Sequence, residues 1–239
     1  MKLNIKNSDD FNKLLSVLAT EIVNANIFFK LHYNLKSAAT EYEKEFNQSV
    51  TFWNITFQAL LDATLFRLCR IYDTHEKSNS LLNLLDTIKE NLHIFDETNF
   101  RVRLKDNPFV DSLAESARKP DLKQLDEDIE YASDKNPLVN NLRVWRNTIF
   151  AHRSASTIIK GKKLPDNYPF SMDNIAELLE KGMSILNHYS GLFRASTHST
   201  QIVGYDDYQY VLNCIRADLK RREEEFEREL RRYGHGESP

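Results

Sequence analysis

Apolar residues recur at three- and four-residue steps along most of the 239-residue chain. This spacing predicts amphipathic helices, because residues three and four positions apart share one helix face. Segment 48–73 is apolar nearly all round, which is typical of a central helix. The predicted helices cover about 8–34, 48–73, 80–92, 126–132, 137–151, 171–193 and 205–233, with a polar helical stretch over 35–47 and a mixed region over 93–136.

Residues that favour helix starts precede several of these segments. Ser8, Ser80 and Ser171 stand at predicted N-cap positions, and Pro137 stands at a predicted first helical position. The chain holds 6 glycines and 6 prolines, too few for the many tight turns of a β-sandwich or barrel. The pattern therefore predicts an all-α protein without a glycine-rich phosphate loop.

Net charge, cysteines and histidine spacing limit the kinds of binding site that the chain can form. The net charge of -3 creates no global attraction for nucleic acid, so RNA or DNA contacts require a local patch. Cys69 and Cys214 form no metal or redox motif, and both are predicted to be free core thiols in a reducing cytosol. No histidine or glutamate spacing places two ligands on one helix face, so neither a metal nor a cofactor is expected.

The N-terminal residues and the lengths of the apolar runs indicate the cellular compartment. The first residues lack the apolar region of a signal peptide, and no run approaches 18 apolar residues. We therefore expect a cytoplasmic protein with no membrane partner. Between 220 and 232 there are six basic and five acidic side chains, with Glu224–Arg228 and Glu227–Arg231 at i,i+4 spacing. This favours a solvated or dimer-flanking helix over an RNA-binding arm.

One helix carries residues suited to phosphate chemistry. Arg146 is followed by Asn147, and His152 comes six positions after the arginine. Arginine makes charge-assisted contacts with phosphate, and histidine transfers protons near neutral pH. An arginine followed after four to six residues by a histidine also occurs at Arg70 to His75, which lies in a polar loop, and at Arg228 to His235, which lies in the tail, but only Arg146 to His152 lies in an apolar-periodic helix.

The helical wheel leaves two interpretations of His152 open. One arc holds the polar residues Arg143, Arg146, Asn147 and Arg153. His152 falls on the opposite side with Trp145 and Ile149, where a histidine is commonly a core residue. If the helix unwinds at Ala151, His152 can instead turn toward the polar face.

Other residues have similarly open roles. Asp62 lies on an apolar stripe, either as a site carboxylate near Arg146 or as a structural partner of a basic residue. Arg70 and Asp73 are expected to pair with each other or with Arg146. A basic loop follows the motif, and it either tracks an RNA backbone or is an ordinary solvated loop: Arg153, Lys160, Lys162 and Lys163.

These motifs resemble the HEPN superfamily, the all-helical nucleotide-binding and RNA-cleaving domains of prokaryotic toxins and phage defence. The aromatic-rich helix end at 65–73, the short polar loop, the Ser-Leu start at 80–85 and the later Arg146-Asn147…His152 helix are similar to its abortive-infection AbiU-like branch. The resemblance covers about 10–195. It implies an antiparallel HEPN-like helical bundle domain over 1–200, to which we add a C-terminal helix and short tail over 201–239.

The resemblance also implies a function. It suggests a metal-independent endoribonuclease of a phage-defence or toxin system, with Arg146 binding phosphate, His152 transferring protons and Asn147 positioning them. The implied partners are RNA, a second copy in a homodimer with a composite site, and an antitoxin or regulatory protein. The alternatives are a non-catalytic module that binds nucleotide, RNA or protein, and a structural dimer with a relict motif.

Overall fold

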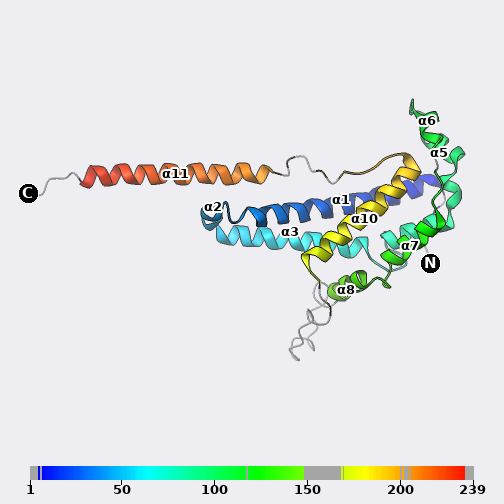
Figure 1. Cartoon of the computed structure of the whole chain (residues 1–239), viewed down its shortest axis with the longest axis horizontal. Coiled ribbons are helices and arrows are strands. Elements are labelled where there is room, and N and C mark those ends of the chain that lie inside the picture. The colour runs from blue at the N-terminus through cyan, green and yellow to red at the C-terminus, as the bar shows by residue number, and fades with distance from the viewer. Residues whose placement is uncertain are drawn as a thin grey trace, which may run out of the picture. The chain divides into compact units, whose positions relative to one another are not determined.

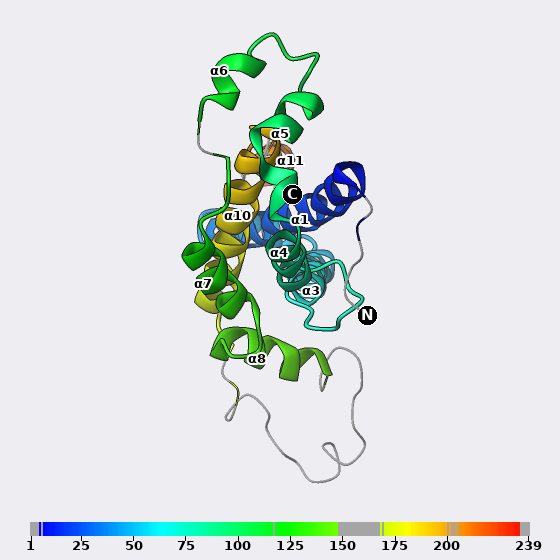
Figure 2. The same cartoon turned by 90° about the vertical axis from the view of Figure 1, so that its right-hand side faces the viewer.

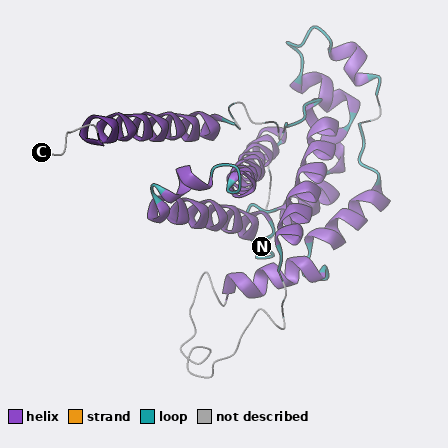
Figure 3. Ribbon diagram, turned by 60° about the vertical axis from the view of Figure 1, so that its left-hand side comes forward, coloured by secondary structure: helices purple, strands orange, loops and turns teal. Residues whose placement is uncertain are grey.

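The computed structural model describes Ile5, residues 7–116, 118–147, Tyr168, residues 170–199, Gln201, Gly204 and residues 206–234. Within this part the elements are helices and turns, with no strand (Figure 3). The helices, including one short 3-10 helix (η1), are α1 (Ser8–Ala38), α2 (Glu43–Asn47), α3 (Val50–Ile71), α4 (Leu81–Glu90), η1 (Leu92–Phe95), α5 (Glu97–Arg103), α6 (Val110–Ala114), α7 (Leu122–Ala132), α8 (Pro137–Trp145), α10 (Met172–Arg194) and α11 (Asp207–Gly234). The predicted all-α fold class is confirmed.

The helices belong to two compact units. The larger unit contains Met1–Phe29 and Asp62–Thr200, and the smaller unit contains Lys30–Leu61 and Gln201–Pro239. Helices α1 and α3 contribute residues to both units, since the boundaries after Phe29 and after Leu61 fall inside these helices. Each unit has its own core and is described by itself.

Two of the three predicted cap residues, Ser80 and Ser171, begin their helices, whereas Asn7 and not Ser8 caps α1, since Asn7 Oδ1 accepts from the Asp10 backbone N–H at 2.9 Å. Ser80 Oγ accepts from the Asn83 backbone N–H, and Ser171 Oγ accepts from that of Asn174. Asn174 also returns a side-chain contact to the Ser171 backbone, which completes a capping box. Pro137 opens α8, where its missing N–H costs nothing. These local side-chain preferences explain why the starts of α4, α8 and α10 are predicted correctly, whereas α7 begins at Leu122, four residues before its predicted start, with Asp121 as its cap.

The core of the larger unit is built from α1, α4 and α10, with η1 and α7 against it (Figure 2). Phe11 packs edge-on against Phe193 and Phe95, with ring centroids 4.7 and 5.7 Å apart. Each fully buried side chain of this size contributes about 1.5–3 kcal/mol by leaving water. Other members with no exposed area are Leu15, Leu18, Leu81, Leu84, Leu85, Ile88, Leu178 and Leu186.

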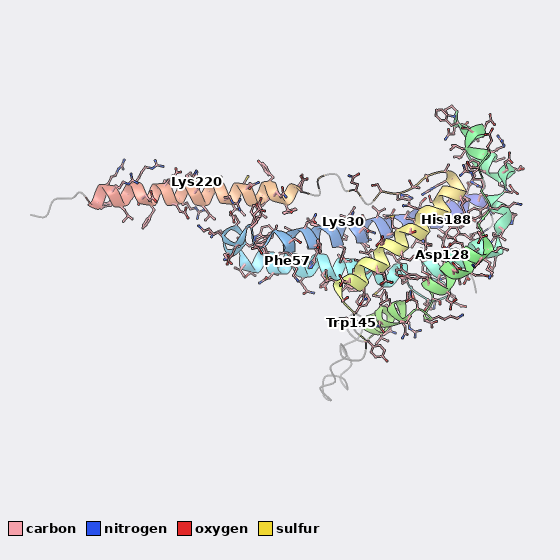
Figure 4. The ribbon with its side chains drawn as sticks, in the orientation of Figure 1. Lys30, Phe57, Asp128, Trp145, His188 and Lys220 are labelled. Carbon is pink, nitrogen blue, oxygen red and sulfur yellow. The ribbon has the colours of Figure 1, made fainter. Side chains whose placement is uncertain are left out.

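A buried carboxylate joins α7 to α10 in this unit. Asp128 is only 3% exposed (labelled in Figure 4). Its oxygens accept from Lys181 Nζ at 2.9 Å, Tyr189 OH at 3.1 Å and Gln124 Nε2 at 3.3 Å. Because a buried charge requires such partners, the cluster fixes α7 against α10.

The C-terminal end of α10 is closed by two arginines from the segment between α4 and α7. Arg103 donates to the Phe193 carbonyl oxygen at 2.8 Å, and Arg118 donates to that of Gly191 at 2.9 Å. The last carbonyls of a helix lack partners within the helix, so Arg103 satisfies that of Phe193, whereas the Gly191 carbonyl also accepts from the Ala195 backbone N–H at 3.0 Å. Burial lowers the pKa of Arg103 to about 10.

The smaller unit is held by an aromatic cluster and by the first half of α11. Phe46 and Trp53 pack edge-on at 4.8 Å, and α11 lies along α2 (Figure 1). The other buried members of this cluster are Leu35, Ala38, Tyr42 and Leu212. From residue 220 to 233 every side chain of α11 is exposed, and the predicted Glu224–Arg228 and Glu227–Arg231 ion pairs are present.

Two predictions about burial are wrong. Helix α3 is not buried all round, because Phe52, Ile55 and Phe66 are 60, 64 and 51% exposed. Cys214 is exposed, whereas Cys69 is buried as predicted. In both cases the periodicity correctly indicates a helix, but the chain covers only one of its faces.

Helix α1 is the element that bears on a membrane. It is long and apolar enough to cross a bilayer by length and composition alone, a test that the core helix of a soluble protein also passes. Phe11, Leu15 and Leu18 of α1 are fully buried within the protein. Glu21, farther along the helix, pairs with Arg67 of α3 at 2.8 Å. These contacts place the first part of α1 in the core of the larger unit, while 33% of its apolar window is buried.

Candidate functional site

The site is built at the C-terminal end of α8. Asn136 caps this helix by accepting from the Leu138 backbone N–H, and Val139 and Leu142 are buried beneath it. After Trp145 the chain continues as a wider, π-helical turn at Arg146 and Asn147 (Trp145 is labelled in Figure 4). Such turns occur frequently at functional sites because they re-aim side chains.

Arg146 is held by a carboxylate from the loop that follows α3. Its Nη1 lies 2.9 Å from Asp73 Oδ1, and its Nε donates to Asn147 Oδ1 at 3.1 Å. The side chains of Arg146 and Asp73 are 32 and 23% exposed. The guanidinium is therefore fixed in orientation and still accessible to a ligand.

The loop that carries Asp73 is itself anchored. Asp73 Oδ1 also accepts from the His75 backbone N–H at 3.0 Å. The His75 carbonyl accepts from Asn83 Nδ2 of α4 at 2.8 Å. Just before the loop, the buried Tyr72 hydroxyl donates to the Leu178 carbonyl of α10 at 2.6 Å. Contacts with two core helices thus set the position of Asp73.

The structure separates the other candidate residues from this pair. Arg143 Nη1 contacts Asp134 Oδ2 at 3.1 Å, on the surface of the α7–α8 turn. Asp62 lies eleven residues before Asp73 on α3, about 16 Å away at 1.5 Å of rise per residue. The carboxylate at Arg146 is therefore Asp73 and not Asp62. Of the two pairings expected for Asp73, the one with Arg146 is present.

Several predicted residues lie outside the described part of the chain. They are His152, Arg153, Lys160, Lys162 and Lys163. Their roles remain predictions from the sequence. Arg70, expected near the site, has Glu21 as its partner at 3.6 Å.

Sequence reasoning missed the closeness of the His75 loop to Arg146. His75 had been placed in an unrelated polar loop, yet it shares an acceptor with the arginine. A local signal exists: an aspartate two residues before a loop residue commonly forms a side-chain-to-backbone turn. That signal fixes the loop, but only the tertiary contact from α8 brings the loop to the site.

Cys69 lies beside the same pair and has an altered acidity. Burial raises the pKa of its thiol to about 12, with the Asp73 charge acting in the same direction and the Arg146 charge opposing both. The thiol is therefore protonated and unreactive at neutral pH.

We expect iodoacetamide at pH 7.5 to label Cys214 at least about tenfold faster than Cys69, because the thiolate is the reactive form. Peptide mass spectrometry over a time course measures both rates. In denaturant the two rates should converge. Comparable labelling of the folded chain at both positions would contradict the buried, protonated state of Cys69.

No group of three or more histidine, cysteine, aspartate or glutamate side chains suited to a metal occurs among the described residues. At the end of α8 the Arg146 guanidinium lies between the Asp73 carboxylate and the Asn147 side-chain amide. Guanidinium groups suit charge-assisted, bidentate contacts with anions such as phosphate.

The described residues form an all-helical fold, with Arg146 and Asn147 at the end of α8. The AbiU2 family model matches residues 8–213, from the start of α1 into α11, and the chain belongs to this HEPN-type, abortive-infection family. No curated protein and no solved structure matches the chain in the corresponding comparisons.

Proposed function

We propose that this protein is a metal-independent endoribonuclease of a phage-defence or toxin system, acting at a composite site in a homodimer. The observation that carries the proposal is Arg146, which is fixed by Asp73 and Asn147 and remains one-third exposed. A preorganised cation of this kind stabilises the negative charge that develops on the non-bridging phosphate oxygens during RNA cleavage.

The proposed reaction needs three groups. The 2′-oxygen of RNA attacks the adjacent phosphorus, the bond to the 5′-oxygen breaks, and a 2′,3′-cyclic phosphate remains. The 2′-hydroxyl loses its proton as it attacks, and the departing 5′-oxygen gains one; His152 makes one of these two transfers and a group of the second copy makes the other. Arg146 binds the non-bridging oxygens, and Asn147 orients the guanidinium through its 3.1 Å contact. The basic residues 153–163 would follow the RNA backbone, and the second copy would supply the remaining groups.

The test is cleavage of a 5′-labelled RNA by purified wild type and His152→Ala, with and without EDTA. We expect cleavage by the wild type only, unaffected by EDTA, with products ending in cyclic phosphate. Cleavage abolished by EDTA would overturn the metal-independent mechanism. Loss of fold in His152→Ala would instead support a core histidine, so circular dichroism accompanies each assay.

A second candidate function is a binding module without catalysis. It is favoured by the Arg146–Asp73 ion pair, since a guanidinium already held by the protein also suits static binding of a phosphate. The two functions separate in one experiment. If the wild type binds the RNA in solution and leaves it intact, the protein is a binding module.

A further inference from the structure

The larger unit contains a pocket lined by the start of α1, the end of α5 and the end of α10. Its volume is about 530 Å³, within the roughly 300–1,000 Å³ of small-molecule sites. Two arginines line it, Arg103 from α5 and Arg194 from α10. The pocket is separate from the Arg146 site. The segment that leads into that site contacts α10 at Leu178, sixteen residues before Arg194, or about 24 Å along the helix.

The hydrogen bonds of both arginines place their guanidinium groups at the wall of this pocket. Arg194 Nη1 donates to Asn12 Oδ1 at 3.1 Å, and Arg103 Nη2 donates to the Phe193 carbonyl oxygen at 2.8 Å. Asn12 and Phe193 also line the pocket. Each guanidinium group therefore lies within hydrogen-bond distance of a second lining residue.

Neither arginine has a carboxylate partner in the part of the chain that the structure describes. Arg103 donates to the carbonyl oxygens of Ile94 and Phe193, and Arg194 contacts only serine, asparagine and histidine side chains. Since a guanidinium group has five N–H donors, at least one on each arginine lacks an acceptor among the described residues. The end of α10 carries about half a negative charge, which offsets only part of two positive charges.

The acidity of Arg194 is consistent with this missing counter-charge. Burial lowers the pKa of its guanidinium group, and no carboxylate opposes that effect. For Arg103 the charge of Asp96 opposes the larger effect of burial only in part. An anion in the pocket would supply the negative charge that both groups lack.

The other polar groups of the lining include a donor and two acceptors. Asn12 uses its Oδ1 toward Arg194, so its Nδ2 is a donor. Asn99 Nδ2 donates to the His93 carbonyl at 3.0 Å, so its Oδ1 is an acceptor. Asp9 adds an exposed carboxylate. A bare anion would have no use for these acceptors, whereas the hydroxyl groups of a ligand would donate to them.

We propose that this pocket binds a small phosphorylated sugar, with its phosphate on Arg103 and Arg194 and its hydroxyl groups on Asp9 and Asn99. Arginine suits the phosphate because its planar set of N–H donors matches two phosphate oxygens at once. The inference does not depend on RNA cleavage, since no residue of this pocket belongs to the Arg146 site.

The test measures binding of ribose 5-phosphate, inorganic phosphate and ribose by isothermal titration calorimetry at pH 7.5. The full-length chain carries Arg146→Ala, so that binding at the Arg146 site does not contribute. We expect ribose 5-phosphate to bind about three- to tenfold more tightly than inorganic phosphate, because hydroxyl contacts add to the phosphate contacts. Ribose alone should give no measurable heat of binding.

Asn12→Asp tests the pocket without removing a structural contact. The new carboxylate can still accept from Arg194 Nη1, and it neutralises that arginine and repels an anion. We expect binding at least about tenfold weaker in a fully folded protein. Thr20→Asp is the matched control, because it adds the same charge at an exposed position of α1 outside the pocket, and it should bind like the starting protein.

Arg194→Gln removes the charge and should also weaken binding at least about tenfold, with circular dichroism as the check on folding. Absence of ribose 5-phosphate binding would overturn the inference, as would unchanged binding in Asn12→Asp. Equal losses in Asn12→Asp and Thr20→Asp would overturn it too, because they would show a general effect of charge. Inorganic phosphate that binds as tightly as ribose 5-phosphate would overturn the assignment to a sugar.

Discussion

Replacing Arg146 by alanine is expected to reduce the rate of RNA cleavage by at least about 100-fold, the usual effect of removing one group that stabilises a developing oxyanion. The reason is the position of the guanidinium, which two contacts orient toward an accessible surface. Initial rates with a 5′-labelled RNA measure the effect. Arg146→Lys should recover only part of the rate, because lysine cannot reproduce the bidentate geometry.

The matched control is Arg143→Ala, which removes an arginine three residues away on the same helix. Arg143 is engaged by Asp134 and Asn140 and makes no contact with Asp73 among the described residues. We expect it to retain cleavage within about twofold. Equal losses in both variants would indicate a general electrostatic effect and contradict a specific role for Arg146. Unfolding midpoints of both variants separate activity from stability.

Replacing Asp128 by alanine is expected to lower the free energy of unfolding of the larger unit by about 1–3 kcal/mol. Asp128 is nearly inaccessible, and its loss leaves Lys181 without its carboxylate partner and Tyr189 without an acceptor. Burial also raises the pKa of the Tyr189 hydroxyl, so that group stays protonated and needs an acceptor. Urea denaturation followed by far-UV circular dichroism measures the change.

Asp126→Ala is the control from the same helix. Asp126 pairs with Lys89 at the surface, where the two side chains are 58 and 49% exposed. Exposed ion pairs contribute about 0–1 kcal/mol, so this variant should unfold almost like the wild type. Similar losses in the two variants would show that the Asp128 cluster does not fix α7 against α10.

Local chemistry explains how much of the fold could be predicted. Ser80, Ser171 and Pro137 determine helix starts through contacts within four residues, and those starts are correct. Periodicity indicates helices but not which face is covered, so the exposed side of α3 and the position of Cys214 could not be inferred.

For the candidate site, too, local features could be predicted from the sequence and tertiary contacts could not. Arg146 and Asn147 were found from their sequence motif, since a helix end and a neighbouring amide are local features. The choice of Asp73 as the partner of Arg146, and the approach of His75, depend on contacts between α8 and the loop after α3. No spacing along the chain encodes those contacts, because they join segments about 70 residues apart.

The two arginines that bind the end of α10 determine which positions tolerate substitution. Arg103 and Arg118 bind the carbonyl oxygens of Phe193 and Gly191, which are main-chain atoms that every residue type provides. Substitution on the α10 side therefore leaves the acceptors in place, whereas substitution of either arginine removes a donor outright. Relatives of this protein should accordingly vary more freely at position 191 than at positions 103 and 118.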